Sequence, residues 1–96
     1  MGDNIPVVIY GDEFCAYCAA ARMLFTKKGV RFEDVLVSRD PDRFDEMQVR
    51  SGGRRTVPQV FVGDVHVGGF DELCSLDKIG EVDKLLAGET AGRHSH

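Results

Sequence analysis

The sequence lacks several features that mark whole classes of protein. It has no tryptophan, only three prolines, and no apolar run near the roughly 20 residues that cross a membrane, so no membrane partner is expected. Its three cysteines are an odd number, unlike the even sets that staple small secreted domains. Positive charge is also in deficit, since the formal net charge is −4. That deficit argues against a nucleic-acid partner.

The chain has the composition of one ordinary globular domain. It contains 96 residues, of which 43% are hydrophobic and 29% charged. We expect a domain over residues 1–88 and a flexible tail over residues 89–96, where apolar periodicity stops. The first residues, Met1-Gly2-Asp3-Asn4, lack the basic region and apolar stretch of a signal peptide, so a cytoplasmic location is expected.

Hydrophobic patterning predicts seven elements along the chain. Short β-branched runs predict strands at residues 7–10, 32–37, 59–62 and 65–67, the last two joined by Gly63-Asp64 as a tight hairpin. Helical composition predicts helices at residues 16–28, at 41 to about 51 with Asp40 as N-cap, and from Asp71 as N-cap to 86 with a bend near Gly80. The order β-α-β-α-β-β-α predicts an α/β thioredoxin fold, a four-stranded mixed sheet flanked by helices.

Chemistry is concentrated in Cys15-Ala16-Tyr17-Cys18, where the first strand turns into the first helix. A thiolate is the nucleophile in disulfide exchange, and a helix N-terminus favours a negative sulfur. Cys18 lies one helical turn later and faces the same side. We therefore predict Cys15 as the nucleophile and Cys18 as the resolving thiol.

Two other interpretations of this cysteine pair are possible from the sequence. One is a structural zinc site, which needs four ligands, but there is no second Cys-x-x-Cys and the other candidates, Cys74, His66 and the tail histidines, have no paired spacing. The other is a pair of inert buried thiols. Redox chemistry is the interpretation we favour, and no metal site is predicted.

A second motif, Thr56-Val57-Pro58, directly precedes a predicted strand. Proline cannot donate a hydrogen bond into a sheet, and a cis Val57–Pro58 bond would turn the backbone groups of Val57 outward to pair with an extended peptide. A proline that simply begins a strand is the alternative. Nearby, Arg50, Arg54 and Arg55 form a cluster able to hold a small carboxylate; a solvated helix end and loop explains the cluster equally well.

Three motifs together resemble the glutaredoxin family: Cys15-Ala16-Tyr17-Cys18, Thr56-Val57-Pro58-Gln59 and Gly68-Gly69-Phe70-Asp71, in register over roughly residues 5–88. The resemblance implies a glutathione-disulfide oxidoreductase that removes glutathione from glutathionylated proteins and reduces small disulfides. Glutathione is then the co-substrate, and disulfide-containing proteins are the partners. The implied glutathione-binding residues are Tyr17, Arg50, Arg55, Thr56, Val57, Pro58, Gly69, Phe70 and Asp71.

The sequence departs from the family pattern at three positions. Ala16 replaces a proline common in dithiol members, and members without it more often hold a [2Fe–2S] cluster between two subunits. The alternative function is therefore a glutathione-ligated cluster carrier or sensor, with Cys15 as ligand in a homodimer; otherwise a monomer is expected. Asp12 stands where many members carry lysine, and Phe70 where cysteine or tyrosine is frequent.

Two further alternatives concern the reductant and the third cysteine. A redoxin served by a thioredoxin-type reductase is a competing function, which Arg50, Arg55 and Asp71 argue against because they suit the two ends of glutathione. Cys74 is expected on the inward side of the last helix as a buried structural thiol. A regulatory or dimer-forming thiol is the alternative.

Overall fold

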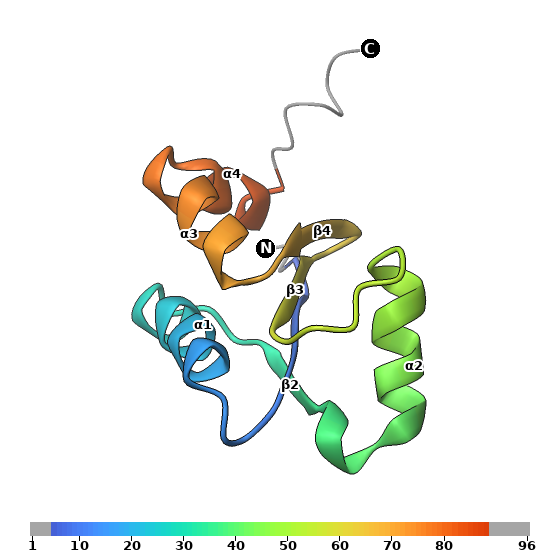
Figure 1. Ribbon diagram of the computed structural model, residues 1–96. Helices are drawn as coiled ribbons and strands as arrows, with labels where there is room; N and C mark the ends of the chain where they lie inside the picture. The colour runs from blue at the N-terminus through green and yellow to red at the C-terminus, as the bar shows by residue number, and fades with distance from the viewer. Residues whose placement is uncertain (1–4, 89–96) are drawn as a thin grey trace.

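The computed structural model describes residues 5–88, which form one sheet covered by helices on both faces (Figure 1). The predicted tail, residues 89–96, and the first four residues lie outside the described residues. The elements follow the predicted order, and the predicted thioredoxin fold is confirmed.

Four short strands make the sheet, in the spatial order β2-β1-β3-β4. They are β1 (Val7–Gly11), β2 (Glu33–Leu36), β3 (Gln59–Val62) and β4 (Val65–Gly68). β1 pairs with β2 in parallel, with Val8 opposite Glu33, and pairs with β3 antiparallel, with Val8 opposite Phe61. The central position of β1 places its carboxyl end, where Cys15 follows, in the middle of the sheet edge.

Helices α1 (Ala16–Lys27), α3 (Phe70–Lys78) and α4 (Glu81–Leu86) cover one face of the sheet, and α2 (Pro41–Arg50) covers the other (Figure 1). A short 3-10 helix, η1 (Val37–Arg39), leads into α2. Its successor Asp40 is the N-cap of α2, and Pro41 occupies the first turn, as predicted. None of the helices in the described part of the chain has the length and apolarity needed to cross a bilayer.

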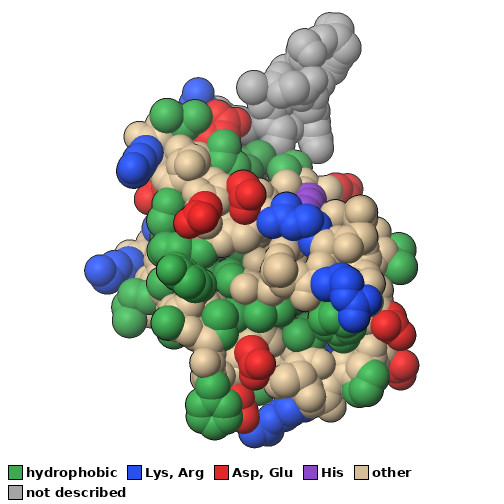
Figure 2. Space-filling view, viewed as in Figure 1, with side chains coloured by type: hydrophobic (Ala, Val, Ile, Leu, Met, Phe, Trp, Pro, Cys, Tyr) green, Lys and Arg blue, Asp and Glu red, His purple; other side chains and the backbone are tan. Residues whose placement is uncertain are grey.

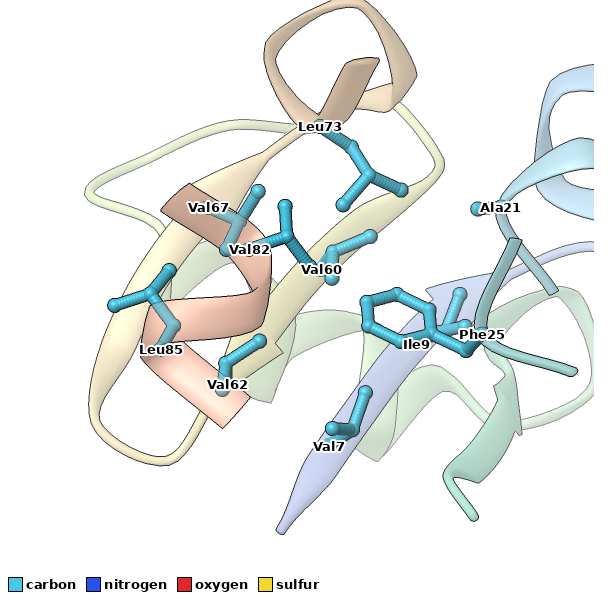
Figure 3. Close-up of a cluster of buried hydrophobic side chains, with 10 residues drawn as sticks. All are labelled: Val7, Ile9, Ala21, Phe25, Val60, Val62, Val67, Leu73, Val82 and Leu85. Carbon is cyan, nitrogen blue, oxygen red and sulfur yellow. The ribbon is translucent and has the colours of Figure 1, made fainter. Parts of the chain in front are cut away.

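Strand alternation divides the core into two clusters. Val7 and Ile9 of β1 and Val60 and Val62 of β3 point to the face covered by α1, α3 and α4 (Figure 3). There they meet the fully buried Phe25 and the other side chains of the cluster: Ala21, Val67, Leu73, Val82 and Leu85. Each large side chain buried in this way contributes about 2 kcal/mol to stability.

The opposite face is smaller and contains polar groups. Tyr10 and Phe61 alternate onto this face and pack edge to face, with ring centroids 5.7 Å apart, above Met47 of α2. The Tyr10 hydroxyl donates a hydrogen bond to Glu46 and accepts one from Arg50 Nη1 at 2.8 Å. Burial and the bond to Glu46 raise the pKa of Tyr10, against the lowering effect of Arg50.

Four predicted details differ in the structure. Gly69, not Asp71, is the N-cap of α3, because the Glu72 carboxylate accepts the Gly69 N–H in the manner of a capping box. The last helix divides into α3 and α4, because Gly80 adopts φ = +78°. The second strand is shorter than predicted, since Val37 begins η1. Cys74, expected to be buried, is half-buried.

Candidate active site

Cys15 is the N-cap residue of α1, at the carboxyl end of the central strand. Its backbone is extended, with φ −111° and ψ 119°, and its sulfur accepts a hydrogen bond from the Cys18 N–H at 3.2 Å. The first turn of α1 has no acidic side chain. The N–H groups of this turn and the helix dipole therefore face the sulfur without a competing carboxylate from the helix itself. Cys15 is partly exposed, as a nucleophile must be.

Cys18 differs from Cys15 in its exposure to solvent. Its side chain is fully buried. Burial, followed by the hydrogen bond with Cys15, raises the pKa of the Cys18 thiol to about 12. The two cysteines are both free thiols in this structure. The asymmetry fits the predicted roles, an exposed attacking sulfur and a protected second one.

The loop before Cys15 is tied to η1. The Asp12 carboxylate accepts hydrogen bonds from the Glu13 N–H at 2.8 Å and the Ser38 hydroxyl at 2.9 Å. Glu13 in turn pairs with Arg39 at 2.6 Å. The negative charge that the sequence places near Cys15 is thus engaged in fixing the loop. Phe14, between this loop and Cys15, is 92% exposed.

A groove of about 280 Å³ begins at Tyr17, two residues from Cys15. Most of its walls come from predicted site residues: Tyr17, Thr56, Val57, Pro58, Gly69, Phe70 and Asp71. The Tyr17 and Phe70 rings lie 6.0 Å apart, so α1 and α3 each contribute one aromatic wall. The Val57–Pro58 bond is cis, as predicted. Within residues 5–88 the backbone groups of Val57 have no hydrogen-bond partner.

The far end of the groove is built on the N-terminus of α3 and contains both signs of charge. Glu72 accepts the Gly69 N–H at 2.6 Å and lies 3.7 Å from Arg54. The hydrogen bond from Gly69 and the charge of Arg54 lower the pKa of Glu72. The N–H groups of Phe70 and Asp71 are without an acceptor among the described residues. Figure 2 shows acidic and basic side chains close together on this face of the molecule.

A buried polar residue holds the loop that precedes the cis proline. Gln59 is fully buried, and its amide donates to the Thr56 carbonyl at 3.0 Å and hydroxyl at 3.3 Å. Its oxygen is 2.7 Å from His66 Nε2, so that nitrogen carries the proton. Burial and the nearby charge of Arg54 lower the pKa of His66. The chain Thr56–Gln59–His66 thus fixes one wall of the groove to β3 and β4.

Two predicted binding residues lie outside the walls of the groove. The Arg50 guanidinium packs 4.2 Å from the centre of the Phe61 ring and donates to Tyr10. The Arg55 guanidinium lies 5.4 Å from the Phe44 ring. Both stack on aromatic side chains of the α2 face, whereas their neighbour Arg54 lines the groove.

Sequence reasoning missed three residues that shape the groove: Arg54, Glu72 and Gln59. Arg54 belonged to the arginine cluster but was not selected as a binding residue. The spacing of Gly69 and Glu72 is that of a capping box, so the carboxylate could have been expected there. Gln59 is part of the Thr56-Val57-Pro58-Gln59 motif, but the sequence does not indicate that it is buried, because a polar residue in a strand more often faces solvent.

A thioredoxin-type sheet with a partly exposed N-cap cysteine and a buried partner one turn later defines a class, the thiol–disulfide oxidoreductases. The glutaredoxin family model matches residues 7–67. Curated glutaredoxins from Pseudomonas aeruginosa and from Neisseria meningitidis serogroup B are 42% and 44% identical over 82 and 81 residues. These matches cover 85% and 83% of this chain, and 96% and 94% of the relatives. The chain belongs to the glutaredoxin family and is an oxidoreductase of that family.

Solved structures agree with this assignment. The solution structure of glutaredoxin from Brucella melitensis is 44% identical, with a TM-score of 0.78, over 93% of this chain and 97% of that one. The crystal structure of a buckwheat glutaredoxin–glutathione complex is 28% identical, with a TM-score of 0.77, over 91% of this chain and 83% of that one. The fold around the groove is therefore that of the family.

Proposed function

We propose that this protein is a glutathione-dependent oxidoreductase that removes glutathione from protein cysteines and reduces small disulfides. The observation that carries the proposal is the groove, which runs from Tyr17, two residues after the N-cap cysteine, to the N-terminus of α3. The similarity to a glutaredoxin solved with glutathione supports the choice of co-substrate.

The reaction follows from the two sulfur environments. The Cys15 thiolate attacks the glutathione sulfur of a glutathionylated protein; a new S–S bond forms to Cys15, and the protein thiolate leaves and takes a proton from water. A second glutathione thiolate then attacks the sulfur of the bound glutathione, which releases glutathione disulfide and restores Cys15. With a disulfide substrate, Cys18 attacks Cys15 instead, and two glutathiones reduce the resulting Cys15–Cys18 bond.

The groove suits the cysteinyl part and the γ-glutamyl end of glutathione. An extended tripeptide pairs with the unpartnered backbone groups of Val57 in the manner of an added strand. The γ-glutamyl carboxylate accepts the unpartnered N–H groups of Phe70 and Asp71, and the Asp71 carboxylate meets its ammonium group. Arg54 lines the groove at this same end, 3.7 Å from Glu72, and adds a positive charge for the γ-glutamyl carboxylate. The predicted binding residues Arg50 and Arg55 lie outside the groove walls and stack on aromatic rings.

The test is a glutathione-coupled assay with a glutathionylated substrate, applied to wild type and both cysteine variants. Cys15→Ser should abolish turnover, because Cys15 is partly exposed whereas Cys18, the other thiol at the start of α1, is buried. Cys18→Ser should retain the monothiol reaction, since only Cys15 takes part in it. Full activity of the Cys15→Ser protein would refute the proposal. Replacing glutathione by a thioredoxin reductase and its cofactor is the second arm, and equal turnover there would assign the competing redoxin function.

The iron–sulfur alternative is a cluster held between two subunits, with Cys15 of each subunit and glutathione as ligands, so one chain would supply only Cys15. A [2Fe–2S] cluster takes four ligands, and Cys15 is the one accessible sulfur at the site, since Cys18 is buried and Cys74 is on α3. No group of three or more metal-binding side chains occurs among residues 5–88. We therefore base no step of the reaction on a cluster.

A further inference from the structure

The resolving cysteine presents a chemical problem. To attack the Cys15 mixed disulfide, Cys18 must become a thiolate, yet its sulfur is fully buried, and burial is the largest cause that raises its pKa. A buried anion is stable only when charge or hydrogen-bond donors compensate for the lost water. The Cys18 thiolate therefore needs such groups near its sulfur.

Arg22 lies one helical turn after Cys18, on the same face of α1. The point where a Cβ on Gly11 would stand is 2.9 Å from Cys18 Sγ and 3.3 Å from Arg22 Nη2. The sulfur and the guanidinium thus border the same small volume, which glycine leaves open. The Arg22 side chain is only 19% exposed, so its charge is screened less than that of a surface arginine.

Two hydrogen bonds fix the guanidinium in this place. Nη2 donates to the Asp12 carbonyl at 2.9 Å, and Nε donates to Asp34 Oδ1 on β2, also at 2.9 Å. The Asp12 contact holds the Gly11–Asp12 backbone against the sulfur. Both the Asp12 backbone and the charge of Arg22 act to lower the pKa of Cys18, against the effect of burial.

The other charged groups around this site have separate partners. Cys15 carries no charge in this step, because its sulfur is bonded to glutathione. The Asp12 carboxylate bonds to Ser38, away from the thiol. On α3, which packs on α1, Glu72 caps its own helix and Asp77 pairs with Lys28, while Asp71 lines the groove. Arg22 and its partner Asp34 therefore set the local charge.

We propose that Arg22 is a positioning residue for the resolving step: its guanidinium fixes the Gly11–Asp12 backbone over Cys18 and stabilises the Cys18 thiolate. In that step the Cys18 thiol gives its proton to water, and the thiolate attacks Cys15 Sγ. The Cys15–Cys18 bond forms, the Cys15–glutathione bond breaks, and glutathione leaves as a thiolate that takes a proton from solvent. The inference rests on the proposed function, because it assigns a residue to the dithiol branch.

The experiment starts from protein carrying glutathione on Cys15 and follows glutathione release against pH. Arg22→Gln, which keeps a donor but removes the charge, should slow release about tenfold at neutral pH and move the pH profile upward by about one unit. Arg22→Lys should restore the rate to within about threefold, because it restores the charge. In a Cys18→Ser background, Arg22→Gln should leave monothiol turnover unchanged.

A second variant should move the pH profile of glutathione release in the opposite direction. Asp34→Asn keeps an oxygen to accept the Arg22 Nε hydrogen bond but removes the negative charge that partly neutralises the guanidinium. The pH profile should therefore move downward. This variant also serves if Arg22→Gln fails to fold.

Three outcomes would overturn the proposal: unchanged profiles in Arg22→Gln, equal losses in Arg22→Gln and Arg22→Lys, or a shift in the same direction for Asp34→Asn. Failure of the proposed function would look different. It would appear as absent monothiol turnover in Cys18→Ser protein with Arg22 intact.

Discussion

The two helices that enclose the groove both begin at it, but their N-termini are capped in different ways. α1 begins at Cys15, whose sulfur accepts the Cys18 N–H, and its first turn has no acidic residue. α3 begins at Gly69, whose N–H is taken by Glu72, and its first turn carries Asp71 and Glu72. At α1 the positive end of the helix dipole faces a reactive sulfur. At α3 the corresponding position is taken by a carboxylate of the same helix.

The difference places the reactive sulfur at the start of α1 and the ligand-binding N–H groups at the start of α3. At α1 an internal carboxylate would compete with the thiolate for the same N–H groups, and none is present in the first turn. At α3 the internal carboxylate fixes Gly69, and the next N–H groups stay open to a ligand. Each end also packs a functional side chain against a glycine, Cys18 against Gly11 and Glu72 against Gly68.

The largest effect is expected from Gly68→Ala, at the α3 end. Gly68 has φ = +111°, and a Cβ there would lie 3.0 Å from Glu72 Oε1 and 3.2 Å from its Cβ. Backbone strain and the displaced carboxylate should together lower the free energy of unfolding by about 3 kcal/mol. Urea denaturation measures this loss.

Gly53→Ala is the matched control for that change. Gly53 has a similar φ of +102°, but a Cβ there meets nothing within 4 Å. It should cost only about 1 kcal/mol, so the excess at Gly68 reports the contact with Glu72. Equal losses at both glycines would show that the close packing of Glu72 has no energetic weight.

The corresponding change at the α1 end, Gly11→Ala, should cost about 2 kcal/mol. A Cβ at Gly11 would lie 2.9 Å from Cys18 Sγ, but its backbone needs no positive φ. Denaturation of Gly11→Ala alone and together with Cys18→Ala forms a double-mutant cycle. Removing the sulfur should relieve part of the loss; a cycle with no coupling would contradict the packing described here.

Glu72→Gln tests the internal anion of α3 and should destabilise by about 1 kcal/mol at neutral pH. The pKa of Glu72 is lowered in the folded protein, chiefly by the Gly69 N–H. The stabilisation is therefore fully present above the ordinary pKa of 4.5 and is lost as pH falls through the lower folded value. Denaturation of wild type and variant at several pH values checks this, and a difference that persists in strong acid would oppose it.

Much of the fold could be predicted because each element carries local signals. The β-branched run at Val7–Tyr10, the Asp40-Pro41 start of α2 and the Gly63-Asp64 hairpin all appear as expected. The error at the start of α3 occurred where one local signal competes with another. Asp71 is a good N-cap residue by type, but the Glu72 carboxylate reaches back to Gly69 and moves the cap two residues earlier.

The motif residues of the site could be predicted from the sequence, but the positions of its charged side chains could be predicted less well. Motif residues follow the backbone, so Tyr17, Val57 and Phe70 line the groove as expected. The sequence alone could not show which arginine of the cluster lines the groove, because side chains close in sequence can point in different directions. Arg54 enters the groove, whereas Arg50 and Arg55 lie on aromatic rings. Likewise, Arg22 reaches Asp34 and Asp12 only through the packing of α1 on the sheet.

The smallest loss of stability is expected from a change at the C-terminal ends of α1 and α3. An ion pair connects these two helix ends. Lys28, the C-cap of α1, pairs with Asp77 of α3 at 2.8 Å and with Asp83 of α4 at 2.9 Å. Lys28→Met should cost about 0.5 kcal/mol, since the partners are partly exposed, and the difference should vanish at about 1 M salt.

The pH dependence of this pair runs opposite to that of Glu72. The two carboxylates raise the pKa of Lys28, so its stabilisation is present below the ordinary lysine value of 10.5 and is lost as pH rises through the folded value. The exposed neighbour Lys27 makes no ion pair within residues 5–88, and Lys27→Met is the control. Equal effects of the two substitutions would mean that the bridge adds nothing. The link between the α1 and α3 ends would then rest on apolar packing alone.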